Sequence, residues 1–377
     1  MANKMKINLL DLQRQSAIIK DELLNKISMT IDNCDFISGS SVSELEMQLK
    51  KYTNSEHVIT CGNGTDALQI ALMSIENSSN NYVICPSFTF VSTAEVIPLS
   101  NCIPYFVDVE KDSFNIDPSQ IRIAAENILK MGGNLVAIIS VDLYGRPCEY
   151  ADISSIANEH NCLHISDCAQ SFGAKYNQLS VLSIADISTT SFFPTKPLGC
   201  YGDGGAIFTN QVDTANIMRS IAVHGKGTNK YDNVRIGMNS RLDTMQAHVL
   251  IEKMKLIESE ILLRQEVATK YITQVENKSI LPSTRKDLLS AWAQFTLTVD
   301  DEYTRDKLKS YLGKFDIPTG IYYPAPLSEQ APYKSFPRLE CKNSLALSKT
   351  VLSLPMSPYL GDQEIAFISD KINSFFK

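Results

Sequence analysis

The sequence of 377 residues has no long hydrophobic run. A membrane-spanning helix needs about 20 consecutive apolar residues, and no apolar stretch here approaches that length. The opening residues, MANKMKINLLDLQRQ, turn polar too soon to form the apolar part of a secretory signal. We therefore expect a cytoplasmic protein with no membrane partner.

Positive charge is also in short supply, because 35 lysines and arginines stand against 42 aspartates and glutamates. No segment is rich in lysine and arginine, and the net charge is -7. An acidic surface does not attract nucleic acid or anionic lipid. We expect neither as a partner.

The sequence lacks any CxxC pair, and its nine cysteines are scattered and odd in number. This pattern is typical of free thiols in a reducing compartment rather than of a disulfide framework or a zinc site. We expect no metal. Histidine is equally sparse: His164 falls in a predicted strand and is interpreted as a core residue, while His224 is kept as a candidate neighbour of a site.

Between residues 57 and 210, short apolar runs alternate with amphipathic segments. This alternation is typical of an α/β fold, in which helices cover both faces of a mainly parallel sheet. Seven strands are predicted, at 57–61, 82–85, 103–109, 135–145, 162–166, 187–193 and 204–209, with helices at 65–75, 92–100, 118–130 and 152–161. Asp117 and Pro118 are a typical cap and first-turn residue for the third of these helices.

The pattern changes after residue 243, where residues 243–276 contain no proline or glycine and predict a long helix. Strands are predicted beyond it at 291–299 and 319–324, and helices at 301–314 and 362–376. We therefore expect a large domain over residues 1–250, with an N-terminal helical segment, and a smaller α+β domain over residues 251–377 that the long helix joins to it.

The stretch TCGNGTDAL at 60–68 is a glycine-rich turn between a predicted strand and a predicted helix. Gly64, Thr65 and Asp66 would open that helix, where free N–H groups and the helix dipole favour a phosphate. GNGTDA also fits the G-x-G-x-x-A dinucleotide pattern. The turn alone predicts a phosphate site without deciding whose phosphate it holds.

Two further residues follow predicted strands. Asp167 ends an apolar strand in HISDCAQSFGA, and Lys196 follows another in TTSFFPTKPLGC, between two prolines. Ligands bind at the carboxyl ends of strands in open α/β sheets. Taken singly, Asp167 could cap a turn, and Lys196 could rest its stem on a phenylalanine while its charge reaches water.

Together, these three features match what pyridoxal phosphate requires. A lysine in apolar surroundings has a lowered pKa and becomes a nucleophile that forms Schiff bases. The cofactor also needs phosphate donors and a carboxylate at its pyridine nitrogen. Phe88 and Phe90 follow the strand at 82–85, and one of them is expected to cover the ring while the other packs in the core.

Asn239, Ser240 and Arg241 form a polar group just before the helix predicted from residue 243. Arg241 could hold the carboxylate of an amino-acid substrate with two hydrogen bonds. It could equally pair with Asp243 at the surface.

The chain resembles the DegT/DnrJ/StrS family of nucleotide-sugar aminotransferases, which are pyridoxal-phosphate enzymes of fold type I. The resemblance runs nearly end to end and rests on several long motifs in one order: GNGTDAL, PSFTFVSTAE, VDLYGRP, ISDCAQSFGA, SFFPTKPLGCYGDGGA and NSRLDTMQA. Its wording is most similar to members that act on UDP-linked 2-acetamido-3-keto-hexuronic acids, which supply surface polysaccharide and O-antigen sugars.

The resemblance implies a role for each candidate residue. Lys196 and Asp167 would be catalytic, with Lys196 forming the Schiff base and moving protons while Asp167 holds the pyridine nitrogen. Phe90 would cover the ring and Gln170 would contact its hydroxyl, while Gly64, Thr65, Asp66 and Ser191 would bind the phosphate. Asn239 would reach the phosphate of the neighbouring subunit in a homodimer with shared sites, and Arg241 would bind L-glutamate or an acidic sugar.

This chain departs from the family at two positions. Many members have histidine where Asp142 and Ser357 stand here, and both positions are expected to lie near the sugar. A dTDP- or UDP-linked 4-keto-6-deoxy sugar is therefore an alternative substrate. A nicotinamide dehydrogenase built on GNGTDA and a non-catalytic sensor are the rivals outside this chemistry.

Overall fold

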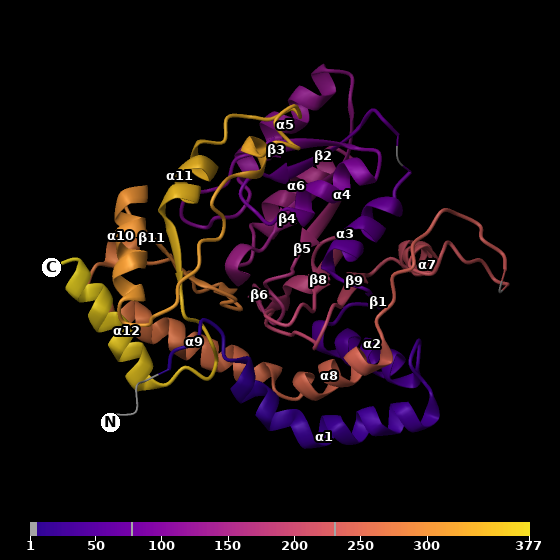
Figure 1. Cartoon of the computed structure of the whole chain (residues 1–377). Coiled ribbons are helices and arrows are strands. Elements are labelled where there is room, and N and C mark those ends of the chain that lie inside the picture. Colours follow the sequence, from indigo (N-terminus) through magenta and orange to yellow (C-terminus); the bar gives the residue numbers. More distant parts are fainter. Residues whose placement is uncertain (1–5, 77, 230) are drawn as a thin grey trace.

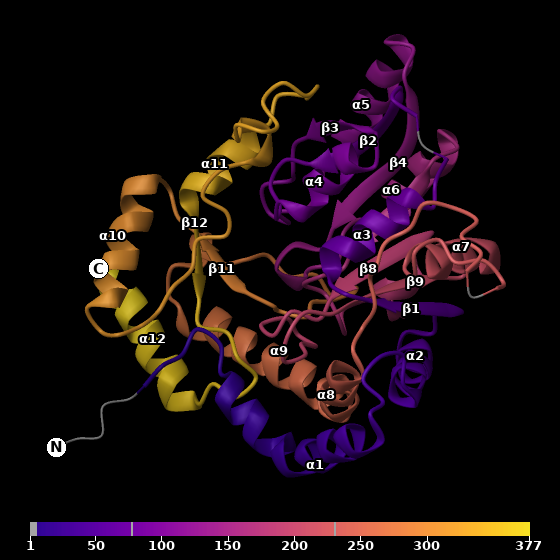
Figure 2. The same cartoon turned by 45° about the vertical axis from the view of Figure 1, so that its right-hand side comes forward.

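A seven-stranded sheet forms the centre of the protein (Figures 1 and 2). The computed structural model describes residues 6–76, 78–229 and 231–377. Most neighbouring strands run parallel, but β9 is antiparallel to both β1 and β8. The strands, in their order across the sheet, are β1 (His57–Cys61), β9 (Gly205–Thr209), β8 (Ile187–Ser191), β5 (Leu163–Asp167), β4 (Asn134–Val141), β2 (Asn81–Pro86) and β3 (Ile103–Val107). The prediction of a mainly parallel sheet of seven strands is confirmed.

Helices cover both faces of this sheet and create two hydrophobic cores. Successive residues of a strand point to opposite faces, so Val58 and Ile59 of β1 enter different cores. One core is closed by α3 (Gly64–Met73), α4 (Ser92–Leu99) and α7 (Val212–Ile221). The other is closed by α2 (Ser40–Thr53), α5 (Pro118–Lys130), α6 (Tyr150–Glu159) and α8 (Thr244–Met254).

The C-terminal part of the chain builds a smaller α+β unit with its own core. Its two antiparallel strands are β11 (Phe295–Thr298) and β12 (Val351–Leu354). The second half of α9 (Ile257–Gln274) packs against them, together with α10 (Glu302–Gly313) and α12 (Asp362–Phe375), while α11 (Lys342–Thr350) leads into β12. The division of domains near residue 250 stays a prediction.

Two predictions for this region are wrong. Residues 243–276 form two helices, α8 and α9, because the chain turns at Lys255 and Leu256. The first turns of α9 bury Ile257 and Ile261 in the same core as α8, and its second half enters the core of the smaller unit. Residues 319–324 do not form a strand beyond one bridge at Gly320. The carbonyl of Tyr322 instead accepts a hydrogen bond from the hydroxyl of Tyr144, so long-range contacts replace a strand ladder.

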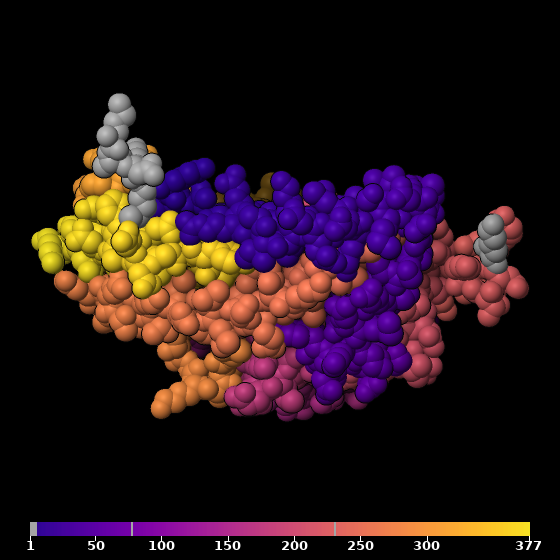
Figure 3. Space-filling model, turned by 90° about the horizontal axis from the view of Figure 1, so that it is seen from below, coloured from indigo at the N-terminus to yellow at the C-terminus, as the bar shows by residue number. Residues whose placement is uncertain are grey.

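The N-terminal α1 (Leu12–Asn33) lies along the underside of the molecule beside α8 and α9, as Figure 3 shows in indigo against orange. The loop after α7 projects from the body of the protein (Figure 1). No helix among the described residues is both long and apolar enough to span a membrane.

The predicted cap of α5 gives a direct test of how local sequence sets this fold. The carboxylate of Asp117 accepts a hydrogen bond from the N–H of Ser119 at 2.8 Å. We expect Asp117→Ala to lower the free energy of unfolding by about 1 kcal/mol, because the first turn of the helix loses its acceptor. The measurement is the urea midpoint. Asp117→Asn keeps an acceptor and is the matched control, so an equal loss in both variants would contradict the cap.

Candidate active site

The carboxyl edge of the sheet brings the candidate residues together. Val141 pairs with Asp167 across β4 and β5, and Asp167 pairs with Thr189 across β5 and β8. Lys196 follows β8 in the next loop. The sheet therefore presents Asp167 and Lys196 from neighbouring strand ends, as predicted.

Asp167 and Lys196 are electrostatically coupled. Burial raises the pKa of the Asp167 carboxyl, while the N–H of Ala169, the charge of Lys196 and the hydroxyl of Thr93 lower it. Burial lowers the pKa of the Lys196 amine, and Asp167 raises it. No ion pair joins the two side chains in the described part of the chain. The two groups influence each other without touching.

Two hydrogen bonds orient the Asp167 carboxylate. The hydroxyl of Thr93 donates to Oδ2 and the N–H of Ala169 donates to Oδ1, both at 3.1 Å. Only 6% of the Asp167 surface is exposed. A buried carboxylate held in this way is suited to bind a ligand N–H.

The turn before α3 approaches β8 so closely that only glycine fits at position 64. A Cβ on Gly64 would lie 2.7 Å from the Cβ of Ser191. Gly64 and Thr65 are the first residues of α3, and N–H groups there have no acceptor within the helix. The result is a cradle with backbone donors and the hydroxyls of Thr65 and Ser191 beside them, which fits a phosphate.

Asp66 lies at this turn with its polar groups already engaged. Its N–H donates to the side chain of Asn63 at 2.8 Å, and its carboxylate accepts the hydroxyl of Ser240 at 2.6 Å. The same Ser240 oxygen accepts the N–H of Gly62 at 2.9 Å. Ser240 therefore fixes the glycine-rich turn before α3, a role that the sequence analysis missed because 174 positions separate it from Asp66.

The two phenylalanines after β2 have different environments. Phe88 is 1% exposed and packs in a core, whereas Phe90 is 51% exposed. The ring of Phe90 lies 6.1 Å from that of Tyr323, centroid to centroid. Phe90 is thus the one available to cover a ligand ring.

Gln170 is 6% exposed and is held by two partners. Its side-chain carbonyl accepts the N–H of Tyr144 at 2.6 Å, and its amide donates to the hydroxyl of Tyr323 at 3.3 Å. Burial raises the pKa of Tyr323, and the charge of nearby Asp167 raises it further. Tyr323 is a second residue that the sequence analysis missed. Its only signal was the tyrosine pair before Pro324.

Asn239 and Arg241 do not join this group within one chain. Both residues are exposed, on either side of the buried Ser240. The described residues show no ion pair between Arg241 and Asp243, so the surface-pair alternative gains no support. Arg241 instead borders a small cavity with Arg219.

The expectation for Asp142 is wrong, because this residue is fully buried behind the site rather than facing a sugar. Its carboxylate accepts hydrogen bonds from the N–H of Cys148 at 2.8 Å, the hydroxyl of Tyr150 at 2.9 Å and the hydroxyl of Ser171 at 2.8 Å. It therefore braces the turn that carries Gln170. Ser357, by contrast, lines a small cavity together with Lys196.

The histidines and cysteines do not form a second site. His164 is buried between Ser140 and Ser154, which confirms its place in the core. His224 is exposed in the projecting loop. Among the described residues, no group of three potential metal ligands is found.

The pH dependence of stability tests the burial of Asp142. Burial raises its pKa from 3.8 to about 6, although its three hydrogen bonds lower it. The folded protein thus binds this proton more tightly than the unfolded chain, and the resulting stabilisation is full below pH 3.8 and lost as the pH rises through about 6.

We expect wild type to lose up to about 3 kcal/mol relative to Asp142→Asn across that window, because each pKa unit is worth about 1.4 kcal/mol. The urea midpoints of both proteins at several pH values give the measurement. Asp152→Asn changes an exposed aspartate of α6 and serves as the control. A gap that does not change with pH would contradict the buried carboxyl.

Known proteins share this whole arrangement of chain and fold. The profile of the DegT/DnrJ/EryC1/StrS aminotransferase family matches residues 17–373. The UDP-2-acetamido-2-deoxy-3-oxo-D-glucuronate aminotransferase of Pseudomonas aeruginosa is 38% identical over 96% of this chain and 98% of that protein. The dTDP-3-amino-3,6-dideoxy-alpha-D-galactopyranose transaminase of Aneurinibacillus thermoaerophilus is 31% identical over 98% of this chain and 99% of that protein.

Solved structures of the same family share the fold of this chain. A DegT/DnrJ/EryC1/StrS aminotransferase from Brucella abortus is 41% identical with a TM-score of 0.96, covering 98% of this chain and 99% of that one. The NtdA protein of Bacillus subtilis, solved with the cofactor PMP, is 27% identical with a TM-score of 0.87, covering 100% of this chain and 86% of that one. The partly buried lysine, the carboxylate and the glycine cradle fit the same cofactor. The chain therefore belongs to the DegT/DnrJ/EryC1/StrS family of pyridoxal-phosphate-dependent sugar aminotransferases.

Proposed function

We propose that this aminotransferase takes the amino group of L-glutamate and transfers it to a keto group of a nucleotide-linked sugar. Pyridoxal phosphate supplies an electron-poor ring that stabilises negative charge on the substrate carbon. The observation that carries the proposal is the placement of Asp167 and Lys196 at the ends of the neighbouring strands β5 and β8, beside the cradle at Gly64 and without an ion pair between them among the described residues. A lysine and a carboxylate that hold opposite ends of one ring require this arrangement.

Lys196 is proposed as the residue that binds the cofactor and moves protons. Its burial increases the neutral fraction of the amine, which is the form that attacks a carbonyl and accepts a proton. The Lys196 amine would also serve as the base that takes the proton from the α-carbon of glutamate.

The other residues around the ring are proposed to orient it. Asp167 would keep the pyridine nitrogen protonated, with its oxygens held by Thr93 and Ala169. Phe90 would cover one face, and Gln170 would contact the ring hydroxyl. Restricting the ring to one plane aligns the breaking bond and excludes water.

The phosphate is proposed to lie in the cradle between α3 and the end of β8. The N–H groups of Gly64 and Thr65 would bind it, with the hydroxyl of Ser191. Asp66 would act through its position at the turn, because its N–H and carboxylate are already bonded.

The sugar is proposed to be a UDP-linked 2-acetamido-3-keto-hexuronate that supplies surface polysaccharide or O-antigen. Similarity to the Pseudomonas aeruginosa enzyme supports this choice, as does Arg241, an exposed guanidinium with no ion pair among the described residues. The alternative is a dTDP- or UDP-linked 4-keto-6-deoxy sugar, which the dTDP-sugar relative supports.

A homodimer with shared sites is proposed because apolar residues gather beside Asn239 and Arg241. Ile236 is 86% exposed and Val234 is 55% exposed. The bridge between Ile37 and Asp243 places another exposed apolar residue beside the segment that follows Arg241. A second copy of the chain would bury these residues and bring Asn239 to the cofactor phosphate in the site of the neighbouring subunit. We propose the cytoplasm as the place where this dimer works.

Replacing Lys196 tests the proposed chemistry. We expect Lys196→Ala to lose the visible absorbance of the bound cofactor and to fall at least about a thousandfold in amino transfer from glutamate, because nucleophile and proton carrier are the same amine. The measurements are the spectrum before and after L-glutamate, and mass spectrometry of the aminated product. Lys130→Ala, at an exposed lysine of α5, is the control. Activity in Lys196→Ala near that of the control would overturn the assignment.

The identity of the sugar substrate is tested by comparing two keto-sugars. The enzyme is supplied with L-glutamate and with UDP-2-acetamido-3-keto-glucuronate or dTDP-4-keto-6-deoxyglucose in parallel, and the aminated sugar is quantified. Greater kcat/KM for the dTDP sugar would favour the alternative and leave the cofactor chemistry intact.

Mixed dimers test the shared site. We expect inactive Lys196→Ala and impaired Asn239→Ala subunits to regain activity when mixed, because one site of each mixed dimer then has Lys196 and the partner's Asn239 intact. Random exchange would give about a quarter of wild-type activity, since half of the dimers are mixed and each has one intact site. Each variant incubated alone is the control. No recovery after exchange, verified by native mass spectrometry, would contradict the shared arrangement.

A further inference from the structure

A second cavity lies apart from Lys196, between the turn that follows β4 and the N-terminal strand region of the smaller unit. Its volume is about 340 Å³, within the range of small-molecule sites. We call it the Trp292 cavity. Its walls come from η1 (Leu143–Gly145), from α9 and from residues 282–296, and Lys196 and Asp167 are not among them.

The walls of the Trp292 cavity are largely apolar and include three aromatic rings. Phe114, Tyr144 and Trp292 provide the rings, and Ile272 and Leu288 add aliphatic surface. The indole N–H of Trp292 is already bonded to the side-chain carbonyl of Gln265 at 3.0 Å, so its face remains for packing. Such walls favour a flat, apolar body.

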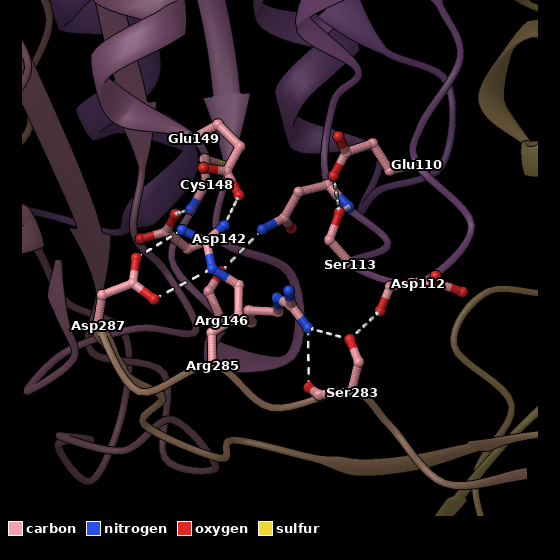
Figure 4. Close-up of polar contacts among 11 residues, drawn as sticks. Glu110, Asp112, Ser113, Asp142, Arg146, Cys148, Glu149, Ser283, Arg285 and Asp287 are labelled. Atoms are coloured by element: carbon pink, nitrogen blue, oxygen red, sulfur yellow. Dashed lines mark hydrogen bonds and ion pairs between the residues drawn. The ribbon is translucent and has the colours of Figure 1, made fainter. Parts of the chain in front are cut away.

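The charged groups on the wall are all of one sign. Arg146 and Arg285 line the Trp292 cavity, and no carboxylate is among its described lining residues. Arg285 is neutralised by Glu149 and Asp287, which lie outside the lining (Figure 4). Arg146 forms no ion pair in the part of the chain that the structure describes, although the carboxylates of Glu149, Glu110 and Asp112 lie near enough to influence its pKa.

The guanidinium of Arg146 is held at one end only. Its Nη1 donates to the carbonyl of Ser283 at 2.8 Å and to its hydroxyl at 2.6 Å (Figure 4). Its Nε is buried without a hydrogen-bond partner. Burial and the charge of Arg285 lower the pKa of Arg146, while the charges of Glu149, Glu110 and Asp112 raise it. A carboxylate binds a guanidinium through two parallel hydrogen bonds.

A second unpaired group lies on the same wall. The side-chain oxygen of Gln294 is buried with no hydrogen-bond partner, and Gln294 lines the Trp292 cavity. Unpaired buried polar groups are rare in folded proteins because each one costs free energy. The Nε of Arg146 and the side-chain oxygen of Gln294 are thus two unpaired polar atoms on residues of one cavity wall, and a guest with complementary groups would satisfy them once these side chains turn toward it.

We propose that the Trp292 cavity binds a small aromatic carboxylic acid, with its carboxylate at Arg146, its ring against Trp292 and Tyr144, and a hydroxyl or amino group toward Gln294. The Trp292 cavity is connected to the candidate cofactor site through Tyr144. Tyr144 forms part of the wall, and its N–H holds Gln170 at 2.6 Å. A guest in the Trp292 cavity therefore contacts a residue that orients the cofactor's surroundings.

Trp292 provides the readout, because it is the single tryptophan of the chain. The purified enzyme with its cofactor is titrated with benzoate, 4-hydroxybenzoate and benzamide while tryptophan fluorescence is recorded. We expect saturable changes with both acids, tighter binding of 4-hydroxybenzoate, and at least about tenfold weaker binding of benzamide, which has the same shape without the charge. Equal affinity for benzoate and benzamide, or no saturable change, would overturn the proposal. The absence of a saturable change would mean that the Trp292 cavity holds water rather than an aromatic acid.

A variant pair and a competition locate the site. We expect Arg146→Gln to weaken benzoate at least about tenfold, whereas Arg122→Gln, at an exposed arginine paired with Glu159, leaves it unchanged. Saturating L-glutamate should not displace benzoate. Displacement by L-glutamate would place the acid at the active site and overturn the proposal. In a crystal grown with 4-bromobenzoate, a bromine signal away from Trp292 would also overturn it. These outcomes are read without turnover, so they are independent of the proposed sugar reaction.

Discussion

The placement of a partly buried lysine and a buried aspartate at the carboxyl edge of one sheet is the constraint on which the site depends. Removing both charges from water favours their neutral forms, and each partly restores the charge of the other. The price is tolerable because the Asp167 carboxylate keeps two hydrogen bonds. The parallel strands β5 and β8 make this arrangement possible, because their carboxyl ends lie side by side at one edge of the sheet. Asp167 at the end of β5 and the loop that carries Lys196 after β8 therefore face the same site.

Polar residues behind the site keep its parts in register. Asp142 receives three hydrogen bonds and ties the turn after β5 to the start of α6. Ser240 links the glycine-rich turn before α3 to the segment that presents Asn239 and Arg241 outward. A displacement of either brace would move a residue on the front of the site, so these buried groups are part of its geometry although they face no ligand.

The sequence predicts what depends on neighbouring residues. Apolar runs locate the seven strands, the Asp117–Pro118 pair locates the start of α5, and the glycines of GNGTDA locate a close approach that Gly64 confirms. These features follow from local sterics and burial.

Features that depend on distant contacts escape the sequence. The break between α8 and α9 has no glycine or proline to mark it, and the residues on both sides of it pack in the same core. Tyr323 reaches Gln170 across 153 positions. Asp142 follows a strand just as Asp167 does, yet donors from Cys148, Tyr150 and Ser171 surround it and take it out of reach. Strand-end position alone does not separate a braced carboxylate from an available one.

The proposed roles divide recognition between two parts of the chain. The groups assigned to the cofactor, such as Lys196 and Gly64, lie on the sheet edge of a single chain. The groups assigned to the neighbouring site and to the acidic substrate, Asn239 and Arg241, lie on an exposed segment. Substitutions on that segment would alter the acceptor without disturbing a sheet edge whose geometry the core fixes. This division agrees with the range of sugars named among relatives that share 31% to 38% of their residues with this chain.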